Sequence, residues 1–147
     1  MDIDNDCFEH WARFRQTRFW HVERGGLLFS PTVGSIDGHI DIVSTTGPTK
    51  GDRAGRTWLK FNHAQVRRDI DLKFEQGQHF VGYWHTHPER RPVPSSSDRY
   101  ALTENLAAGG ISLHRMIAVI VGNGTIEVST RVFVVDGHTL QRLPPVS

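Results

Sequence analysis

The sequence predicts an α/β fold in which helices pack against one central mixed β-sheet. Two features favour this class. Apolar and β-branched runs typical of strands recur along the chain, and between them lie segments whose apolar residues are spaced as on one helix face. The chain has 147 residues, of which 37% are hydrophobic, which is enough for one core. We therefore expect a single domain over residues 1–147.

The N-terminal half is expected to begin with a short helix. Residues 7–19 place Phe8, Trp11 and Phe14 at roughly helical spacing. Glycines and a proline predict a loop over residues 46–56. The strands expected in this half, from their apolar and β-branched residues, are 25–30, 38–45 and 57–61.

A second helix is predicted over residues 62–76. Asn62 is a suitable N-cap, and Gly77 is a suitable residue to end the helix. The apolar residues recur four apart and would form one stripe: Val66, Ile70 and Phe74.

The C-terminal half is expected to contain a third helix and more strands. Residues 96–108 carry Leu102 and Leu106 on one face and are followed by two glycines, so we predict a helix there. The strands expected in this half are 79–86, 115–122 and 125–135. Residues 115–122 are almost continuously apolar, which is typical of a strand covered on both faces. Residues 143–147 are expected to be loose.

The stretch YWHTHPERRPVPSSSDRY, residues 83–100, combines two histidines with an aspartate. Alternate residues of a strand share a face, so His85 and His87 would project side by side, with alpha carbons about 6.6 Å apart. Pro88 ends the strand and places both rings at the rim of the sheet. Asp98 falls in the first turn of the next predicted helix, from which its carboxylate can point back. Two imidazoles, one carboxylate and a fourth position for water form a catalytic zinc shell.

A purely structural interpretation of the same residues stays open. The chain has nine histidines, so an H-x-H pair can occur by chance. Ser95 and Asp98 also have the spacing of a capping box at the start of a helix.

A zinc hydrolase also needs a base that takes a proton from water and passes it to the leaving amine. Glu89 follows a proline, and Asp98 would already be a ligand, so neither suits this role. Glu23 is the upstream candidate, because it opens a strand and precedes Gly25 and Gly26, which allow close packing. The alternative is that Glu23 is a surface charge before a turn.

Three motifs in the chain resemble those of one enzyme family. They are E-x-G-G-L-L-F starting at Glu23, G-x-W-H-T-H-P at residues 82–88, and P-S-x-x-D ending at Asp98. Together they resemble the JAB/MPN family, the JAMM zinc metalloproteases that remove ubiquitin-like proteins, and especially its compact bacterial members. The resemblance covers about residues 12–135, the expected core of the domain.

The resemblance implies a cytidine-deaminase-like fold with a curved central sheet. It also implies one Zn²⁺ ion held by His85, His87 and Asp98. Glu23 would hold and deprotonate the attacking water, and Ser95 would hydrogen-bond near the carbonyl oxygen and help to stabilise the oxyanion. The family cleaves the amide bond after a carrier's C-terminal glycine, often an isopeptide bond to lysine. Such a flexible tail can add to a sheet edge as a strand.

Several functions are compatible with this resemblance. The leading hypothesis is a deconjugating isopeptidase that acts on a ubiquitin-like protein or its conjugate. Its partners would then include activating and conjugating enzymes of the same operon, as in antiphage operons of the CBASS type. The alternative is a peptidase that trims a sulfur-carrier protein after Gly-Gly. A non-catalytic scaffold is disfavoured because all five functional positions are present. The H-x-H…Asp order disfavours an iron oxygenase.

Two arginines lie beside the motif and suggest where a substrate binds. Arg90 and Arg91 would flank the substrate groove and attract an acidic partner surface. The alternative is that they belong to a charged loop that is only solvated.

The composition excludes some classes of partner. The net charge of +1 gives no attraction toward nucleic acid or a membrane surface, and no apolar run reaches the length of about 18 residues typical of a membrane span. The acidic N-terminus does not resemble a secretory signal, and the single cysteine, Cys7, cannot form an internal disulfide. We therefore expect a cytoplasmic protein.

Overall fold

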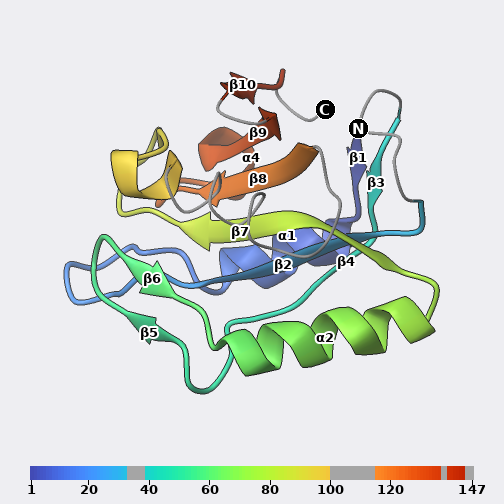
Figure 1. Cartoon of the computed structure of the whole chain (residues 1–147). Coiled ribbons are helices and arrows are strands. Elements are labelled where there is room, and N and C mark those ends of the chain that lie inside the picture. The colour runs from blue at the N-terminus through green and yellow to red at the C-terminus, as the bar shows by residue number, and fades with distance from the viewer. Residues whose placement is uncertain (33–38, 100–114, 137–138, 145–147) are drawn as a thin grey trace.

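A computed structural model of the protein describes residues 1–32, 39–99, 115–136 and 139–144. Its centre is a six-stranded sheet in the order β10-β9-β8-β7-β2-β4 (Figure 1). The strands of this sheet are β2 (Gly25–Ser30), β4 (Ser44–Thr45), β7 (His79–Thr86), β8 (Arg115–Val121), β9 (Thr130–Asp136) and β10 (Thr139–Arg142). The strands β7 and β8 are parallel and the other neighbours are antiparallel, so the predicted mixed sheet is confirmed.

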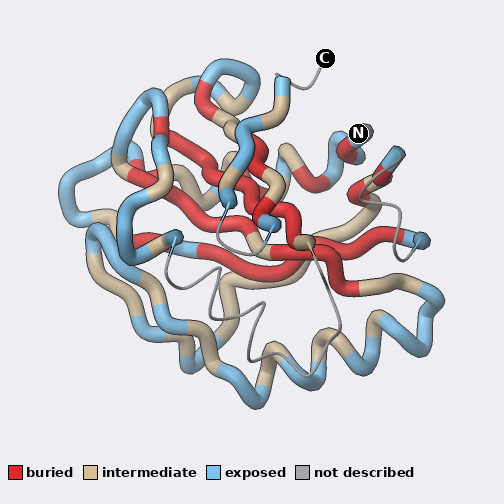
Figure 2. Tube along the Cα trace, turned by 45° about the horizontal axis from the view of Figure 1, so that its top comes forward, coloured by how far each residue is buried: buried red, intermediate tan, exposed pale blue. Residues whose placement is uncertain are grey.

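Two hydrophobic clusters, one on each face of the sheet, hold the layers together. Helix α1 (Asn5–Ala12) contributes Trp11 to one cluster. Helix α2 (His63–Glu75) lies against the other face, where Val66 and Ile70 pack on the second cluster (Figure 1). Successive apolar residues of β2 alternate between the two clusters, as the period of a strand requires. Because both faces are covered, the central strands are buried along most of their length (Figure 2).

Helix α2 agrees with its prediction over residues 62–76. The side chain of Asn62 accepts a hydrogen bond from the backbone N–H of Gln65 at 3.3 Å and so caps the helix. Gly77 has a φ of +77°, a conformation that favours glycine and ends the helix. Phe74 is 65% exposed, so the third member of the predicted stripe does not enter the core.

The N-terminal helix is shorter at its C-terminal end than the predicted span 7–19. Helix α1 ends at Ala12, and turns and irregular chain continue until β2 begins. Gln16 lies in the irregular part of the predicted span. It is only 2% exposed, and its side chain donates to the carbonyl oxygens of His21 and Arg56, so it points into the protein and binds neighbouring loops.

The predicted strand 38–45 is divided between two sheets. The strand β3 (Asp41–Ile42) pairs in parallel with β1 (Asp2–Ile3), whereas β4 joins the central sheet beside β2. The division is a tertiary effect, because the two ends of the segment have different partners.

The predicted loop 46–56 contains one strand of a small hairpin. The strand β5 (Arg53–Ala54) pairs with β6 (Leu59–Lys60), and β6 is shorter than the predicted strand 57–61. Figure 1 shows this hairpin at the same side of the molecule as the C-terminal end of β7.

The predicted strand 125–135 is wrong in its first part. Helix α4 (Ile126–Ser129) forms one turn, and β9 begins at Thr130. Backbone N–H groups of Val128 and Ser129 donate to the carbonyl of Thr125, which closes the turn. Alternation of apolar residues alone did not reveal this turn, since local hydrogen bonds compete with strand pairing.

The third predicted helix is described only at its start. Residues 96–99 are helical, and the remainder of the predicted span 96–108 lies outside the described residues. Residues 143–144 have no regular structure, and the rest of the expected loose tail also lies outside the described residues. Within the described part of the chain, no helix combines the length and apolar character required to cross a bilayer.

Candidate metal centre

The two histidines of the H-T-H stretch lie at the C-terminal end of β7, between β2 and β8. His85 is paired with Gly25 on one side and Ile120 on the other, and His87 donates its backbone N–H to Val121 at 2.9 Å. Both residues are nearly buried, with 8% and 5% exposure. The strand ladder therefore fixes both rings at the rim of the sheet, as the sequence predicts.

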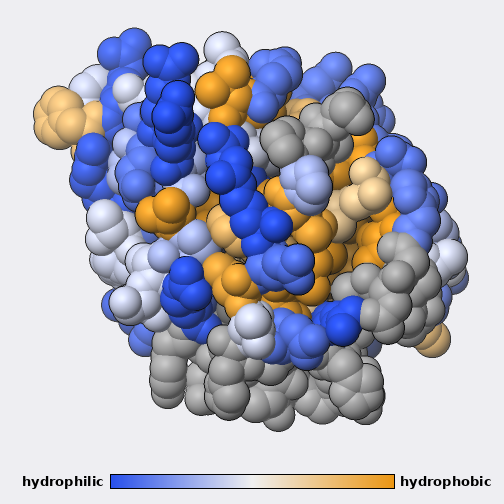
Figure 3. All heavy atoms as spheres, turned by 90° about the horizontal axis from the view of Figure 1, so that it is seen from above, coloured by the Kyte–Doolittle hydropathy of each residue, from blue (hydrophilic) through white to orange (hydrophobic). Residues whose placement is uncertain are grey.

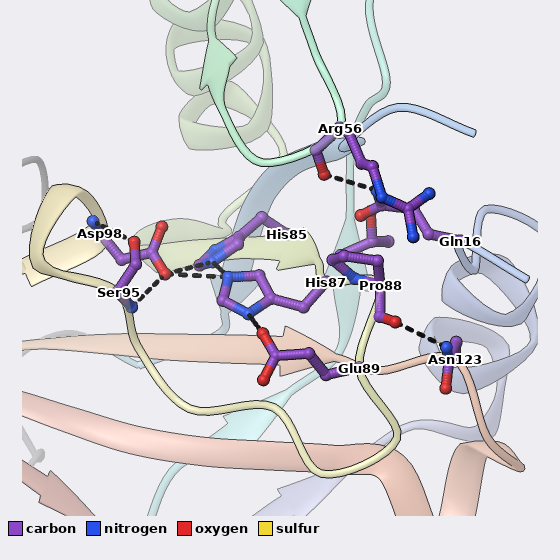
Figure 4. Close-up of polar contacts among 10 residues, drawn as sticks. Gln16, Arg56, His85, His87, Pro88, Glu89, Ser95, Asp98 and Asn123 are labelled. Atoms are coloured by element: carbon purple, nitrogen blue, oxygen red, sulfur yellow. Dashed lines mark hydrogen bonds and ion pairs between the residues drawn. The ribbon is translucent and has the colours of Figure 1, made fainter. Parts of the chain in front are cut away.

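Three ligand atoms converge beyond this strand end (Figure 4). The Nε2 atoms of His85 and His87 lie 3.1 Å apart, and the Oδ2 atom of Asp98 lies 3.4 Å and 2.9 Å from them. Zinc binds its ligands at about 2.0–2.1 Å in a tetrahedron, whose edges are then roughly 3.3 Å. The three observed separations are close to this edge, so the residues fit a tetrahedral cation.

Asp98 also belongs to a capping box with Ser95. The backbone N–H of Ser95 donates to Oδ2 of Asp98 at 2.8 Å, and the backbone N–H of Asp98 donates to Oγ of Ser95 at 3.0 Å. The two interpretations of this spacing are therefore compatible, because the cap orients the same carboxylate that approaches the histidines. A hydroxyl that accepts a hydrogen bond keeps its own proton, which Ser95 can donate to a substrate.

Glu23 joins this group from a segment without regular structure, just before β2. Its backbone N–H donates to the carbonyl of Gly55 in the β5–β6 hairpin at 2.8 Å. Glu23 is 2% exposed, so the interpretation as a surface charge is wrong. One ligand atom from each of Glu23, His85, His87 and Asp98 lies within 4.8 Å of the other three.

The four side chains perturb each other's ionisation. Burial raises the pKa of Glu23 to about 8; the charge of His87 opposes this rise and that of Asp98 adds to it. Burial also acts to raise the pKa of Asp98, but hydrogen bonds from His85, His87 and the Ser95 backbone hold it well below its usual range. Burial lowers the pKa of His87, whereas its hydrogen bond with Asp98 and the nearby carboxylates raise it, with a net rise. Two carboxylates buried beside facing imidazole nitrogens form a donor set that suits a divalent cation.

Glu89 approaches the far side of the His87 ring. Its Oε1 lies 3.3 Å from Nδ1 of His87, an ion-pair distance without hydrogen-bond geometry (Figure 4). Histidines that bind metals usually present their second nitrogen to a carboxylate, carbonyl or water, which fixes the ring. The position of Glu89 therefore suits a supporting contact for His87.

The two arginines of the predicted substrate groove lie outside this cluster. Arg90 and Arg91 are exposed on the loop after the H-T-H stretch. Burial lowers the pKa of Arg131, and the positive charges of Arg142 and Arg91 lower it further. Figure 3 views the side of the molecule that carries β9 and β10, where hydrophilic side chains cross and surround apolar patches.

Two residues that support the site were missed by the sequence analysis. Asn123 donates from Nδ2 to the carbonyl of Pro88 at 2.7 Å, and its backbone N–H donates to the carbonyl of Glu89 at 2.9 Å. Gln16 is bonded to Thr86, which lies between the two histidines. Neither residue carries a local pattern that indicates these contacts, because both partners are distant in the sequence.

Comparison with known proteins identifies the family. Residues 9–134 match the Prok-JAB model, described as prokaryotic homologues of the JAB domain. The chain belongs to the Prok-JAB family. It is 30% identical over 122 residues to a CD-NTase/cGAS isopeptidase of Escherichia coli (strain TW11681), covering 81% of this chain and 74% of the relative. It is 33% identical over 132 residues to a protein of the same name from Pseudomonas aeruginosa (strain BWHPSA011 / Pa011), covering 87% and 80%.

Solved structures show the same fold. A Desulfitobacterium hafniense protein aligns with a TM-score of 0.69 and 14% identity, over 97% of this chain and 88% of that one. A JAB1/MPN domain protein from Archaeoglobus fulgidus aligns with a TM-score of 0.55 and 13% identity, over 99% and 97%. The Prok-JAB protein therefore has the JAB1/MPN fold that its motifs resemble.

Proposed function

We propose that this Prok-JAB protein is a zinc-dependent isopeptidase. It would cleave the amide bond after the C-terminal glycine of a ubiquitin-like protein, or of a protein conjugated by a ubiquitin-like pathway. The observation that carries the proposal is the convergence of Glu23, His85, His87 and Asp98 at one point. The isopeptidase names of its relatives from two bacterial species support the same reaction class.

His85, His87 and Asp98 would hold the ion. Their ligand atoms lie at 2.9–3.4 Å from one another, which suits a tetrahedral cation with one position left for water or substrate. When bound, zinc would polarise the scissile carbonyl and lower the pKa of water to about 7.

Glu23 would act as the base and then as the acid. Its burial makes its carboxylate a better proton acceptor than an exposed one, because the protonated form is favoured there. After taking a proton from the attacking water, Glu23 would pass it to the leaving amine of the lysine side chain. Ser95 would donate its hydroxyl proton to the carbonyl oxygen as negative charge develops there.

The substrate is proposed from the names of the relatives and from the chemistry of the site. A conjugate of a CD-NTase/cGAS-type enzyme, attached through a C-terminal glycine, is the substrate that these names indicate. Activating and conjugating enzymes encoded beside this protein would then produce the bond that it hydrolyses.

The test uses candidate carriers fused through their C-terminal glycine to a reporter. One set carries the reporter on a lysine side chain, and a second set carries it as a linear extension after Gly-Gly. We expect cleavage of the lysine-linked set, loss of cleavage with a chelator, and recovery when zinc is added back. Cleavage that persists in chelator would refute the metal assignment. Cleavage of the linear set alone would replace the isopeptidase with a peptidase that trims sulfur carriers.

A further inference from the structure

A buried polar network lies on the opposite face of the strand that carries the histidines. Thr86, between His85 and His87, is fully buried. Its hydroxyl donates to Oε1 of Gln16 at 2.9 Å and accepts the backbone N–H of Arg24 at 2.9 Å. The backbone N–H of Thr86 also donates to the carbonyl of Arg24 at 2.9 Å. The end of β7 is thus joined to the residue that follows Glu23.

Gln16 extends this network to two further segments. Its Nε2 donates to the carbonyl of Arg56 at 2.8 Å, in the loop between β5 and β6 (Figure 4). The same Nε2 donates to the carbonyl of His21 at 3.4 Å. In these bonds the amide oxygen of Gln16 accepts once and its amide nitrogen donates twice. One amide therefore links the chain after α1, the segment before Glu23, the hairpin loop and the end of β7.

The same hairpin loop holds Glu23 directly. Gly55, next to Arg56, accepts the backbone N–H of Glu23 at 2.8 Å. The backbone of Glu23 is consequently held on one side by the hairpin and on the other by the pair of bonds between Arg24 and Thr86. Both supports are connected through the side chain of Gln16.

We propose that Gln16 is a positioning residue that, through Thr86 and the Arg56 carbonyl, holds the Glu23 carboxylate at the point where His85, His87 and Asp98 converge. Gln16 is not one of the converging groups, so its effect falls on where the base lies relative to the metal ligands. The proposal rests on the proposed function for its catalytic consequence, whereas the coupling between the segments is a property of the folded chain alone.

The first arm of the test compares Gln16→Met with Thr86→Val. Each substitution removes hydrogen bonds at nearly constant volume. We expect kcat on the lysine-linked reporter to fall about 10- to 100-fold in each, with KM within about twofold and zinc affinity within about threefold of wild type. Because both act through one contact, the double variant should be no slower than the slower single variant. Thr86→Ser, which keeps the hydroxyl, should retain most of kcat.

The second arm measures the metal-free protein. Amide hydrogen exchange at Glu23 and Arg24 should become about tenfold faster in Gln16→Met, while amides of β8 keep their protection. Gln76→Met, at an exposed position of the C-cap of α2, is the matched control and should change neither exchange nor kcat.

The outcomes separate the two proposals. Normal kcat in Thr86→Val, additive losses in the double variant, or a parallel fall of zinc affinity and kcat would each overturn the role of Gln16. If Gln16→Met does not fold, Thr86→Val and Thr86→Ser test the same network from its other end. The wild-type protein could cleave no carrier while Gln16→Met still shows the expected faster exchange at Glu23 and Arg24. That result would refute the proposed function and leave the coupling standing.

Discussion

The two parts of the candidate metal centre are held in place by different means. His85 lies in β7, which is hydrogen-bonded to β2 on one side and to β8 on the other, and His87 directly follows the strand and donates its backbone N–H to the carbonyl of Val121. Glu23 lies outside every helix and strand, and its segment is held by Gly55, Thr86 and the side chain of Gln16. One part is supported by a repetitive ladder, and the other by a few individual contacts.

This difference indicates how each part should respond to substitution. In a ladder, the neighbours of a lost hydrogen bond still hold the strand, so we expect the proposed metal ligands to tolerate changes near them. In the segment of Glu23, each contact has its own partner, so loss of one can shift the base without unfolding the sheet. A displacement of about 1 Å at a reacting group can cost about 100-fold in rate. We therefore expect binding of the metal and turnover to separate in variants.

The largest effect is expected from removing a ligand on the ladder side. His85→Ala should abolish zinc binding at micromolar concentrations and abolish turnover, because a ligand loss exceeds the roughly 10- to 100-fold effect of an outer contact. Metal analysis after gel filtration measures the first effect, and the reporter assay the second. His63→Ala, at an exposed position on α2, is the control and should bind zinc normally. Full zinc content in His85→Ala would show that the ion is held elsewhere.

The second-largest effect is expected from replacing the proposed base, Glu23. Glu23→Gln should keep zinc but lower kcat by about 10²- to 10⁴-fold, the usual contribution of general acid–base catalysis. Zinc content and kcat measured on the same preparation test this separation. Glu75→Gln, an exposed change at the end of α2, should leave both unchanged. A normal rate in Glu23→Gln would remove this residue from the mechanism.

The metal-free protein provides a pH test of the same residue. Burial raises the pKa of Glu23 to about 8 from 4.5, so the unfolded chain releases this proton at lower pH than the folded one. The folded state therefore loses stability from this group as pH rises between these values. Glu23→Gln, which does not ionise, should gain stability over wild type by up to a few kcal/mol near pH 8, and little below pH 4.5. Urea unfolding at both pH values measures the difference in stability between Glu23→Gln and wild type. The same difference at both pH values would contradict the assignment.

A smaller effect is expected from loosening the loop between His87 and Asp98, which Asn123 holds through Pro88 and Glu89. Asn123→Ala removes the hydrogen bond to the Pro88 carbonyl, and should cost about 1 kcal/mol of stability. We expect kcat to fall only a few-fold, because the backbone bond from residue 123 to Glu89 remains. Asn5→Ala, at the exposed start of α1, is the control. A loss of zinc in Asn123→Ala would show that this loop, and not only the ladder, holds the ligands.

The smallest effect is expected outside the cluster. Reversing both Arg90 and Arg91 to Glu should raise KM a few-fold, weaken its salt dependence and leave kcat unchanged, because exposed charges act mainly on encounter with an acidic partner. KM measured at low and high salt tests this. The same reversal at Arg67 and Arg68, exposed on α2, should have no effect. Equal KM values in both pairs of variants would remove these arginines from substrate binding.

Much of the ladder side was predictable because its signals are local. The apolar run of β7 ends at Thr86, as predicted, and the period of two places His85 and His87 on one face. The spacing of Ser95 and Asp98 predicts the observed capping box, which directs the carboxylate toward the histidines. The side of Glu23 was predictable only through motif resemblance, since no local pattern in residues 13–24 specifies which loop will bury Gln16 and Glu23.

The sequence by itself determined the strands β2, β7 and β8, the capped helix α2 and the two short segments that carry the proposed metal ligands. These features depend on residues a few positions apart, whose periodicity and capping act locally. Only the tertiary structure decided that Glu23 is buried beside the histidines and that Gln16 connects its segment to Thr86. The physical reason is that these contacts join segments distant in the chain. Their formation depends on the pairing of β2 with β7 and on burial of polar groups that require partners.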